Sequence, residues 1–248
     1  MRRASLGAGF GLGAVVGLLA VEILLLTRRG YLPPDPGYRV DVRIGPAAGT
    51  PLRLAVLGDS TVAGVGSPTA GESLPALIGE RVAAATERPV QVVGFGRSGA
   101  RTATVRSEQL PRLAGGWDAI VLVVGSNDAT HATFWLRFRE DAEAMLAQAR
   151  ALAPVVVLAG TPRFHANRII PEPLRTMVDR YAAVLRRQQR EAVAAVPGSR
   201  FVDLAEEASP RFLDAPEATS MDGFHPSPIG YGFWADALAP AVVAGLTD

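Results

Sequence analysis

The chain has 248 residues, of which 48% are hydrophobic, and this length suits one domain with a sizeable core. Its formal net charge of +1 provides no electrostatic case for nucleic-acid binding. Neither cysteine nor lysine occurs, which excludes disulfides, thiolate metal sites, cysteine nucleophiles, lysine-dependent phosphate loops and Schiff-base enzymes.

An apolar stretch runs from Ala4 to Thr27, with Glu22 as its one charged residue and a pair of arginines on each side. It is long enough to cross a hydrocarbon core of about 30 Å as a helix. The sequence therefore predicts a single-pass transmembrane anchor over residues 1–29. A cleaved signal peptide is the less favoured alternative, because the apolar region exceeds the usual length of about 7–15 residues. The arginines flank both ends equally, so the side of the membrane stays open.

Residues 30–51 contain five prolines and several glycines, a composition typical of a semi-extended tether between an anchor and a domain. Within this segment, residues 38–44 alternate polar and apolar side chains, a pattern compatible with an added edge strand. The remaining chain, residues 52–248, is predicted to form one domain.

Five short runs rich in Val, Leu or Ile predict strands that are buried on both faces of a parallel sheet. They lie at 52–57, 90–94, 118–124, 154–159 and 200–203. Helical patterns separate them, at 72–86, 101–114, 132–151, 174–195 and 228–244. This alternation predicts an α/β fold with a mostly parallel five-stranded sheet and helices on both faces.

Polar and glycine-rich segments follow three of these strands, and a fourth precedes the last helix. They are Gly58-Asp59-Ser60, Gly94 to Gly99, Gly125-Ser126-Asn127-Asp128 and Asp222-Gly223-Phe224-His225. Ligands of open α/β sheets bind outside the carboxyl ends of the strands. We therefore expect the four segments to meet at one edge of one sheet.

These residue types suit nucleophilic catalysis. Ser60 becomes a nucleophile only if a base removes its proton, and His225 is one of only three histidines in the chain. Asp222 is close enough in sequence to orient the imidazole. An oxyanion would find donors in the backbone N–H groups of Ser60 and Gly99 and in the side-chain amide of Asn127.

Taken together, the four segments resemble the blocks of the SGNH (GDSL-type) hydrolases, in order and approximate spacing, over residues 52–244. The resemblance implies a flavodoxin-like three-layer α/β/α sandwich and metal-independent, cofactor-free ester hydrolysis. It also implies that Ser60 is the nucleophile, that Gly99 and Asn127 are oxyanion donors, and that Asp222 and His225 act as a pair. The chain looks similar to membrane-tethered bacterial members. It departs from the usual pattern at Thr61, where leucine is expected, and at Gly94, where asparagine is usual.

The neighbouring residues have structural interpretations. Asp59 and Asp128 are predicted to support the loops that carry Ser60 and Asn127. His131 is predicted to be structural. His165 is predicted to be a solvent-exposed residue in the loop 161–167, which lies at the active-site edge and is a candidate to shape the substrate pocket. No histidine pair has metal-ligand spacing, so we expect no metal site.

Alternatives of other classes remain. Gly94 to Gly99 also fits a dinucleotide-binding fingerprint, but it follows the second strand, and Asp118 lies at the wrong end of the next strand to meet a ribose. An acyltransferase would use the same site, and a non-catalytic binding module would keep only the fold. The favoured prediction is a membrane-anchored serine esterase that acts on small-molecule or lipid-like acyl esters through an acyl-enzyme intermediate.

Overall fold

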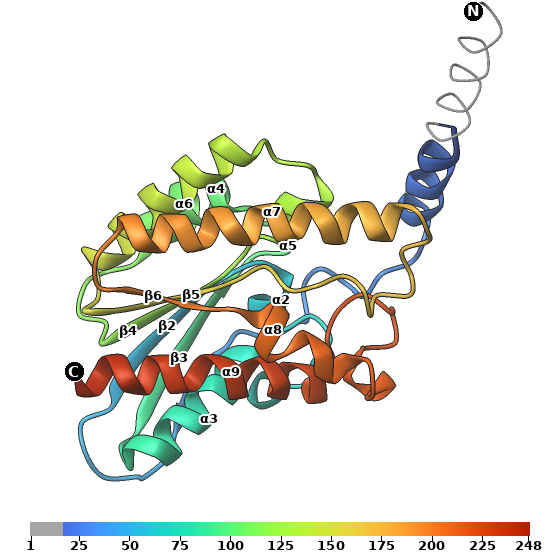
Figure 1. The fold of residues 1–248 in the computed structure, drawn as a ribbon. Coiled ribbons are helices and arrows are strands. Elements are labelled where there is room, and N and C mark those ends of the chain that lie inside the picture. Colours follow the sequence, from blue (N-terminus) through green and yellow to red (C-terminus); the bar gives the residue numbers. More distant parts are fainter. Residues whose placement is uncertain (1–16) are drawn as a thin grey trace, which may run out of the picture.

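The computed structural model describes residues 17–248. Its centre is one six-stranded sheet with the strand order β1-β3-β2-β4-β5-β6 (Figure 1). The strands are β1 (Asp41–Ile44), β2 (Leu52–Gly58), β3 (Val90–Gly96), β4 (Ala119–Val123), β5 (Val155–Ala159) and β6 (Ser199–Val202). All pairs are parallel except β1 with β3. The predicted α/β class and mostly parallel sheet are therefore confirmed.

The prediction of five strands is wrong by one, because β1 adds a sixth from within residues 30–51. Asp41 lies opposite Val93 in an antiparallel pairing with β3. Val42 and Ile44 pack against the core, whereas Asp41 and its alternate neighbour Arg43 are exposed. The alternation of polar and apolar side chains thus suits β1 to an edge position, where one face of the strand packs against the core and the other faces water.

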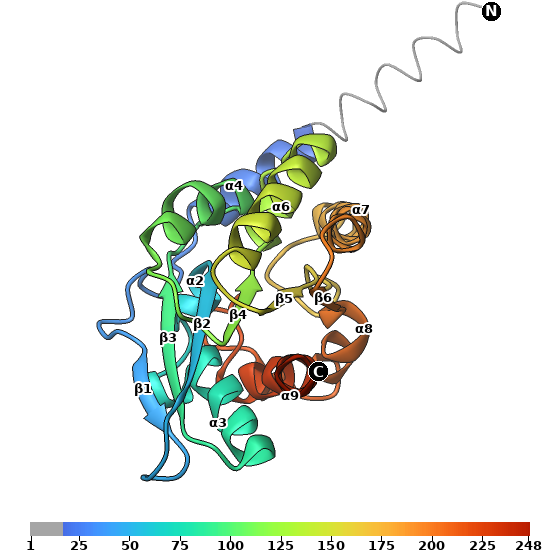
Figure 2. The same ribbon diagram turned by 90° about the vertical axis from the view of Figure 1, so that its left-hand side faces the viewer.

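Helices cover both faces of the sheet, as expected. They are α2 (Ser60–Ala63), α3 (Leu74–Thr86), α4 (Thr102–Thr104), α5 (Ser126–Thr130), α6 (Trp135–Arg150), α7 (Leu174–Ala195), α8 (Leu204–Glu207) and α9 (Pro228–Thr247). Helices α3 and α9 pack on one face, and α6 and α7 on the other (Figure 2). Successive strand side chains point to opposite faces, so Val121 of β4 joins one core cluster while Ile120 and Leu122 join the other.

One predicted helix is not continuous. In place of a helix over 101–114, the chain forms the short α4, a π-helical turn at Val105–Gln109 and a 3₁₀ turn at Leu110–Arg112. Pro111 lies in that last turn, where it has no N–H to continue α-helical hydrogen bonding. The resulting irregular segment turns the Gln109 side chain inward, where it is buried.

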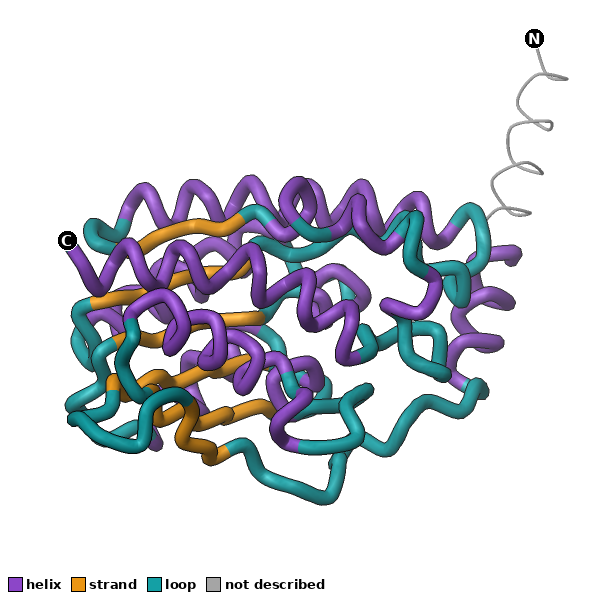
Figure 3. The backbone as a smooth tube through the Cα atoms, turned by 90° about the horizontal axis from the view of Figure 1, so that it is seen from below, coloured by secondary structure: helices purple, strands orange, loops and turns teal. Residues whose placement is uncertain are grey.

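The predicted anchor lies partly outside the described residues, since these begin at Gly17. Gly17–Thr27 forms a short apolar helix beyond the carboxyl ends of the strands (Figure 3). Within residues 17–248, only α9 is long and apolar enough to cross a membrane, and its Tyr231, Leu238 and Val242 are fully buried in the core. The described part of the chain therefore shows no N-terminal transmembrane helix.

Candidate active site

The loop that carries Ser60 is held by buried side chains on both sides. Asp59 caps α2 by accepting hydrogen bonds from the Thr61 backbone N–H (3.0 Å) and hydroxyl (2.8 Å). Just before it, the Gln109 side chain accepts from the Gly58 N–H (3.0 Å) and donates to the Gly58 carbonyl (2.7 Å). These bonds fix the backbone at the end of β2, so Ser60 begins α2 in a defined position.

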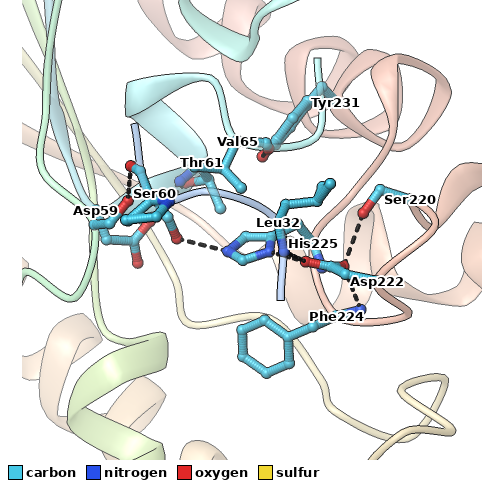
Figure 4. A network of polar contacts seen from close by, with 12 residues as sticks. Leu32, Asp59, Ser60, Thr61, Val65, Ser220, Asp222, Phe224, His225 and Tyr231 are labelled. Carbon is cyan, nitrogen blue, oxygen red and sulfur yellow. Dashed lines mark hydrogen bonds and ion pairs between the residues drawn. The ribbon is translucent and has the colours of Figure 1, made fainter. Parts of the chain in front are cut away.

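Ser60, His225 and Asp222 form one hydrogen-bonded chain (Figure 4). His225 Nδ1 lies 2.7 Å from Asp222 Oδ2, and His225 Nε2 lies 3.0 Å from Ser60 Oγ. An ionised carboxylate can only accept, so Nδ1 carries the proton and Nε2 is left to accept from the Ser60 hydroxyl. All three residues are at most 9% exposed, which strengthens these bonds by excluding water.

Asp222 is stabilised as a carboxylate by a dense set of donors. Its Oδ1 accepts from the Ser220 hydroxyl (2.8 Å) and from the backbone N–H groups of Phe224 (2.8 Å) and His225 (2.9 Å). Burial by itself raises the pKa of Asp222, but the bonds from His225, Phe224 and Ser220 outweigh it and lower the pKa to about 2. Gly223, at φ +70°, permits the tight turn that directs these donors to one carboxylate.

The two backbone donors predicted for the oxyanion have no acceptor among the described residues. Within residues 17–248, neither the Ser60 N–H nor the Gly99 N–H has a hydrogen-bond acceptor. Gly99 has φ +76°, and a Cβ built on it would meet no atom within 4 Å, so glycine is required there for backbone conformation rather than for space.

The Asn127 side chain connects the loops that carry these donors. Its Nδ2 donates to the carbonyl of Ala100 (3.1 Å), the residue after Gly99, and makes a longer bond to Asp59 Oδ2 (3.4 Å). One amide hydrogen therefore holds the Gly99 loop. The other makes only the long bond to the carboxylate of Asp59, the residue before Ser60.

The two carboxylates predicted to support these loops are both buried. Asp128 Oδ2 accepts from the Thr102 N–H (2.9 Å) and hydroxyl (3.0 Å), and so joins α5 to α4. Burial raises the pKa of Asp128 and of Asp59, against the opposing effect of their threonine donors. Both residues act within the protein interior on the loops that surround Ser60.

A small cavity opens beside Ser60 and His225. Its volume is about 80 Å³. Four aromatic side chains contribute to its wall, namely Phe164, Phe212, Phe224 and Trp234. Phe224 belongs to the Asp222–His225 block, and Phe164 to a loop that follows the strand predicted at 154–159. Sequence reasoning missed Phe212 and Trp234, because their segments carry no site motif.

The other two histidines stand apart from this hydrogen-bonded chain. His131 Nδ1 donates to the Asn127 carbonyl at 2.8 Å, at the end of α5. His165 does not line the cavity, although Phe164 and Ala166 on either side of it do. Burial lowers the pKa of His165. Among residues 17–248, no cluster of three or more metal-ligating side chains occurs.

The fingerprint Gly94 to Gly99 lies at the end of β3, and its last glycine belongs to the site just described. Asp118 lies at the opposite end of the sheet, where its carboxylate accepts from the Arg53 N–H at 2.7 Å. A dinucleotide site would need an acidic residue at the carboxyl end of a neighbouring strand. Asp118 instead stabilises the start of β2 through this hydrogen bond.

A comparison with protein families finds that residues 56–233 match the GDSL-like lipase/acylhydrolase family. The chain belongs to this family. The predicted enzyme class, a carboxylic ester hydrolase of the GDSL type, is therefore confirmed. A comparison with curated protein sequences finds no match.

Solved structures of three other proteins have folds similar to that of this chain. Axe2, an acetylxylan esterase from Geobacillus stearothermophilus, is 20% identical with a TM-score of 0.58, over 78% of this chain and 95% of that one. The enzyme LAE5 from the metagenome of Lake Arreo is 22% identical with a TM-score of 0.56, over 77% and 94%. A lipolytic G-D-S-L family protein from Veillonella parvula is 15% identical with a TM-score of 0.58, over 75% and 95%. At such identities the likeness concerns the fold.

Proposed function

We propose that this GDSL-family protein is a serine esterase that hydrolyses short-chain O-acyl esters through an acyl-enzyme intermediate. Ser60 is the nucleophile, His225 the general base and Asp222 its orienting acid. The backbone N–H groups of Ser60 and Gly99 and the amide of Asn127 form the oxyanion hole. No cofactor takes part.

In the first half-reaction, Ser60 Oγ attacks the ester carbonyl carbon while its proton moves to His225 Nε2. The carbonyl oxygen becomes an oxyanion and accepts from the two free backbone donors and from Asn127, which exchanges its long bond to Asp59 for this one. The carbon–oxygen bond to the alcohol then breaks, and His225 gives the alcohol its proton. Water repeats these steps on the acyl-enzyme, releasing the acid and restoring Ser60.

The observation that carries the proposal is the unbroken chain from Ser60 Oγ through His225 to Asp222, at 3.0 and 2.7 Å. The low pKa of Asp222 supports its role, because the carboxylate stays charged when His225 becomes an imidazolium.

The cavity supports a short acyl group. Its volume of about 80 Å³ leaves room for a small group beside Ser60. Its aromatic wall suits an apolar acyl chain. Acetylxylan esterases among the structural relatives fit this size, since acetate is the smallest common acyl group of this kind.

The proposal includes attachment to a membrane through the apolar N-terminal stretch. Glu22, its one charged residue, is 4% exposed, and its carboxylate accepts from the Leu174 N–H at the start of α7 (3.2 Å). Glu22 is therefore satisfied by the protein and need not enter lipid. With such an anchor, the site would be close to the bilayer.

The test is hydrolysis of p-nitrophenyl esters by the purified full-length protein in detergent. We expect turnover of the acetate and butyrate esters, and no turnover above background for Ser60→Ala. Intact-protein mass spectrometry after rapid quenching should detect the acyl adduct on the wild type only. Unchanged turnover by Ser60→Ala would falsify the proposed function.

A further inference from the structure

We propose that residues 31–34, which precede the domain in sequence, form part of the active site, and that the Leu32 backbone N–H is a positioning donor for Asp222. The inference rests on the proposed function and adds to it a group from outside the four sequence blocks. The evidence is the course of this segment across the carboxyl end of the sheet.

The first observation is a direct hydrogen bond to the proposed acid. The Leu32 N–H donates to Asp222 Oδ2 at 3.3 Å, across 190 positions of sequence. Figure 4 shows Leu32 next to the Asp222–His225 pair. Among residues 17–248, Oδ2 accepts from two groups only, Leu32 N and His225 Nδ1.

The division of donors between the two oxygens gives Leu32 a distinct role. All three donors to Oδ1 come from the turn of residues 220–225 itself. They hold Oδ1, whereas Oδ2 is bonded only by His225 Nδ1 and the Leu32 N–H among the described residues. The Leu32 N–H holds the second oxygen, the one that faces the imidazole, and so sets the direction in which Oδ2 presents its remaining lone pair to His225.

Two aromatic contacts connect the same segment to the base. The ring of Tyr31 meets Phe224 edge-on at 5.8 Å, and Phe224 meets the His225 ring in the same manner at 5.1 Å. Edge-to-face pairs of this kind are worth about 0.5–1.5 kcal/mol. Tyr31 is thus linked to the His225 ring through Phe224.

Two further contacts fix the course of the segment beyond Leu32. The Ser98 hydroxyl donates to the Pro34 carbonyl, next to Gly99, and the Tyr38 hydroxyl donates to the carbonyls of Gly64 (2.9 Å) and Ser67 (3.0 Å) after α2. The segment therefore touches the loops that carry the proposed nucleophile, the oxyanion donor and the acid.

The segment is also held upstream of Tyr31. Glu22 accepts from the Leu174 N–H, and Leu26 packs against a buried cluster that includes Phe138, Phe164 and Ile170. The helix Gly17–Thr27 and the residues that follow it are thus docked on the domain at both ends of residues 31–34. A flexible tether would make none of these contacts.

The experiment compares three changes at position 32 of the full-length protein. Leu32→Pro removes the N–H, and the position suits proline because Pro33 already restricts Leu32 to extended conformations. Replacing leucine by its α-hydroxy acid exchanges only the N–H for an ester oxygen. Leu32→Ala is the matched control, because it changes the side chain and keeps the N–H.

We expect the two variants that lack the N–H to lose roughly tenfold in kcat, with KM for p-nitrophenyl acetate little changed. The acidic limb of kcat/KM should move upward by on the order of half a pH unit, because a carboxylate with one donor fewer attracts the His225 proton more strongly. Leu32→Ala should leave the limb in place. Asp59 near His225, and Tyr31 and Tyr231 near Asp222, are the other titratable groups that act on the pair, and none of them is altered.

Thermal unfolding of each variant checks that the fold is retained. Should Leu32→Pro fail to fold, the ester variant decides the question, because it preserves the geometry of the chain. An acidic limb and kcat equal to those of Leu32→Ala in the ester variant would overturn the inference. An inactive Ser60→Ala measured alongside keeps that result separate from failure of the proposed function, which would instead show as an active Ser60→Ala.

Discussion

Asp222→Asn tests the electrostatic design of the site most directly. The amide oxygen of the new side chain can take over the three bonds to Ser220, Phe224 and the His225 N–H, and its NH₂ group then faces His225 Nδ1. Two donors cannot bond each other, so His225 must place its proton on Nε2. In that tautomer it cannot accept the Ser60 proton. We expect kcat to fall by roughly 10³–10⁴-fold, the scale seen when the corresponding aspartate of another serine hydrolase is changed in this way.

The same substitution has a measurable effect on stability. Lowering the Asp222 pKa from its ordinary value of 3.8 to about 2 corresponds to about 2.4 kcal/mol, at about 1.36 kcal/mol per pKa unit. The folded pKa lies below the unfolded one, so this stability is fully present above pH 5 and is lost as the pH falls toward 2. About half of it remains at pH 3 by the same relation. Because asparagine keeps some acceptor bonds, about 2.4 kcal/mol is the upper bound of the loss.

The assay is paired. Urea unfolding at pH 7 and at pH 3 gives the difference in free energy of unfolding between wild type and Asp222→Asn, and ester hydrolysis at pH 7–8 gives kcat. We expect the stability difference to shrink by about half at the lower pH, together with the large loss in kcat. A variant with more than a tenth of wild-type kcat, or a stability difference that is equal at both pH values, would refute the roles assigned to Asp222.

Further variants separate the other groups. Asn127→Ala should lower kcat by about 10²–10³-fold in the p-nitrophenyl acetate assay with KM retained, and a loss confined to KM would argue against an oxyanion role. Gly99→Ala should also reduce kcat, because its φ of +76° costs an L-residue about 1–2 kcal/mol; a wild-type rate would show that this backbone is free to relax. His165→Ala should stay within about twofold of wild type, and an inactive variant with an intact fold would mean that the base is misassigned. A panel of p-nitrophenyl esters should peak in kcat/KM at two to four acyl carbons, and a maximum at eight or more would contradict the small cavity.

The sequence predicted most of the fold because burial on both faces leaves a clear pattern. Runs such as Val155–Ala159 are continuously apolar, and the structure buries every residue of that strand. The convergence of the four blocks followed from one rule, that parallel strands bring their carboxyl ends to one edge. A local pattern combined with a topological rule was sufficient for these features.

Other features depend on contacts between distant segments and leave no local pattern. The buried Gln109 looks like any polar helix residue, yet it holds both backbone groups of Gly58. Gln189 acts similarly, accepting from the Thr161 N–H (2.8 Å) and donating to the Val124 carbonyl (3.0 Å), and so joins the ends of β4 and β5. Residues 31–34 were predicted to be part of a tether because the surrounding sequence is rich in proline and glycine. The hydrogen bond from Leu32 to Asp222 leaves no trace in that local composition, because its partners are 190 positions apart.

The three buried aspartates of the site differ in a way that only the structure reveals. Asp59, Asp128 and Asp222 are each at most 7% exposed, yet burial raises the pKa of the first two while the third is lowered to about 2. The difference lies in donor number. Asp222 accepts from four groups of residues 220–225 and from Leu32, whereas Asp59 and Asp128 depend mainly on the donors of one threonine each. Environments that give neighbouring carboxylates different pKa values also suit them to different roles in a site. The carboxylate that bonds His225 therefore stays charged to lower pH than the two that hold loops.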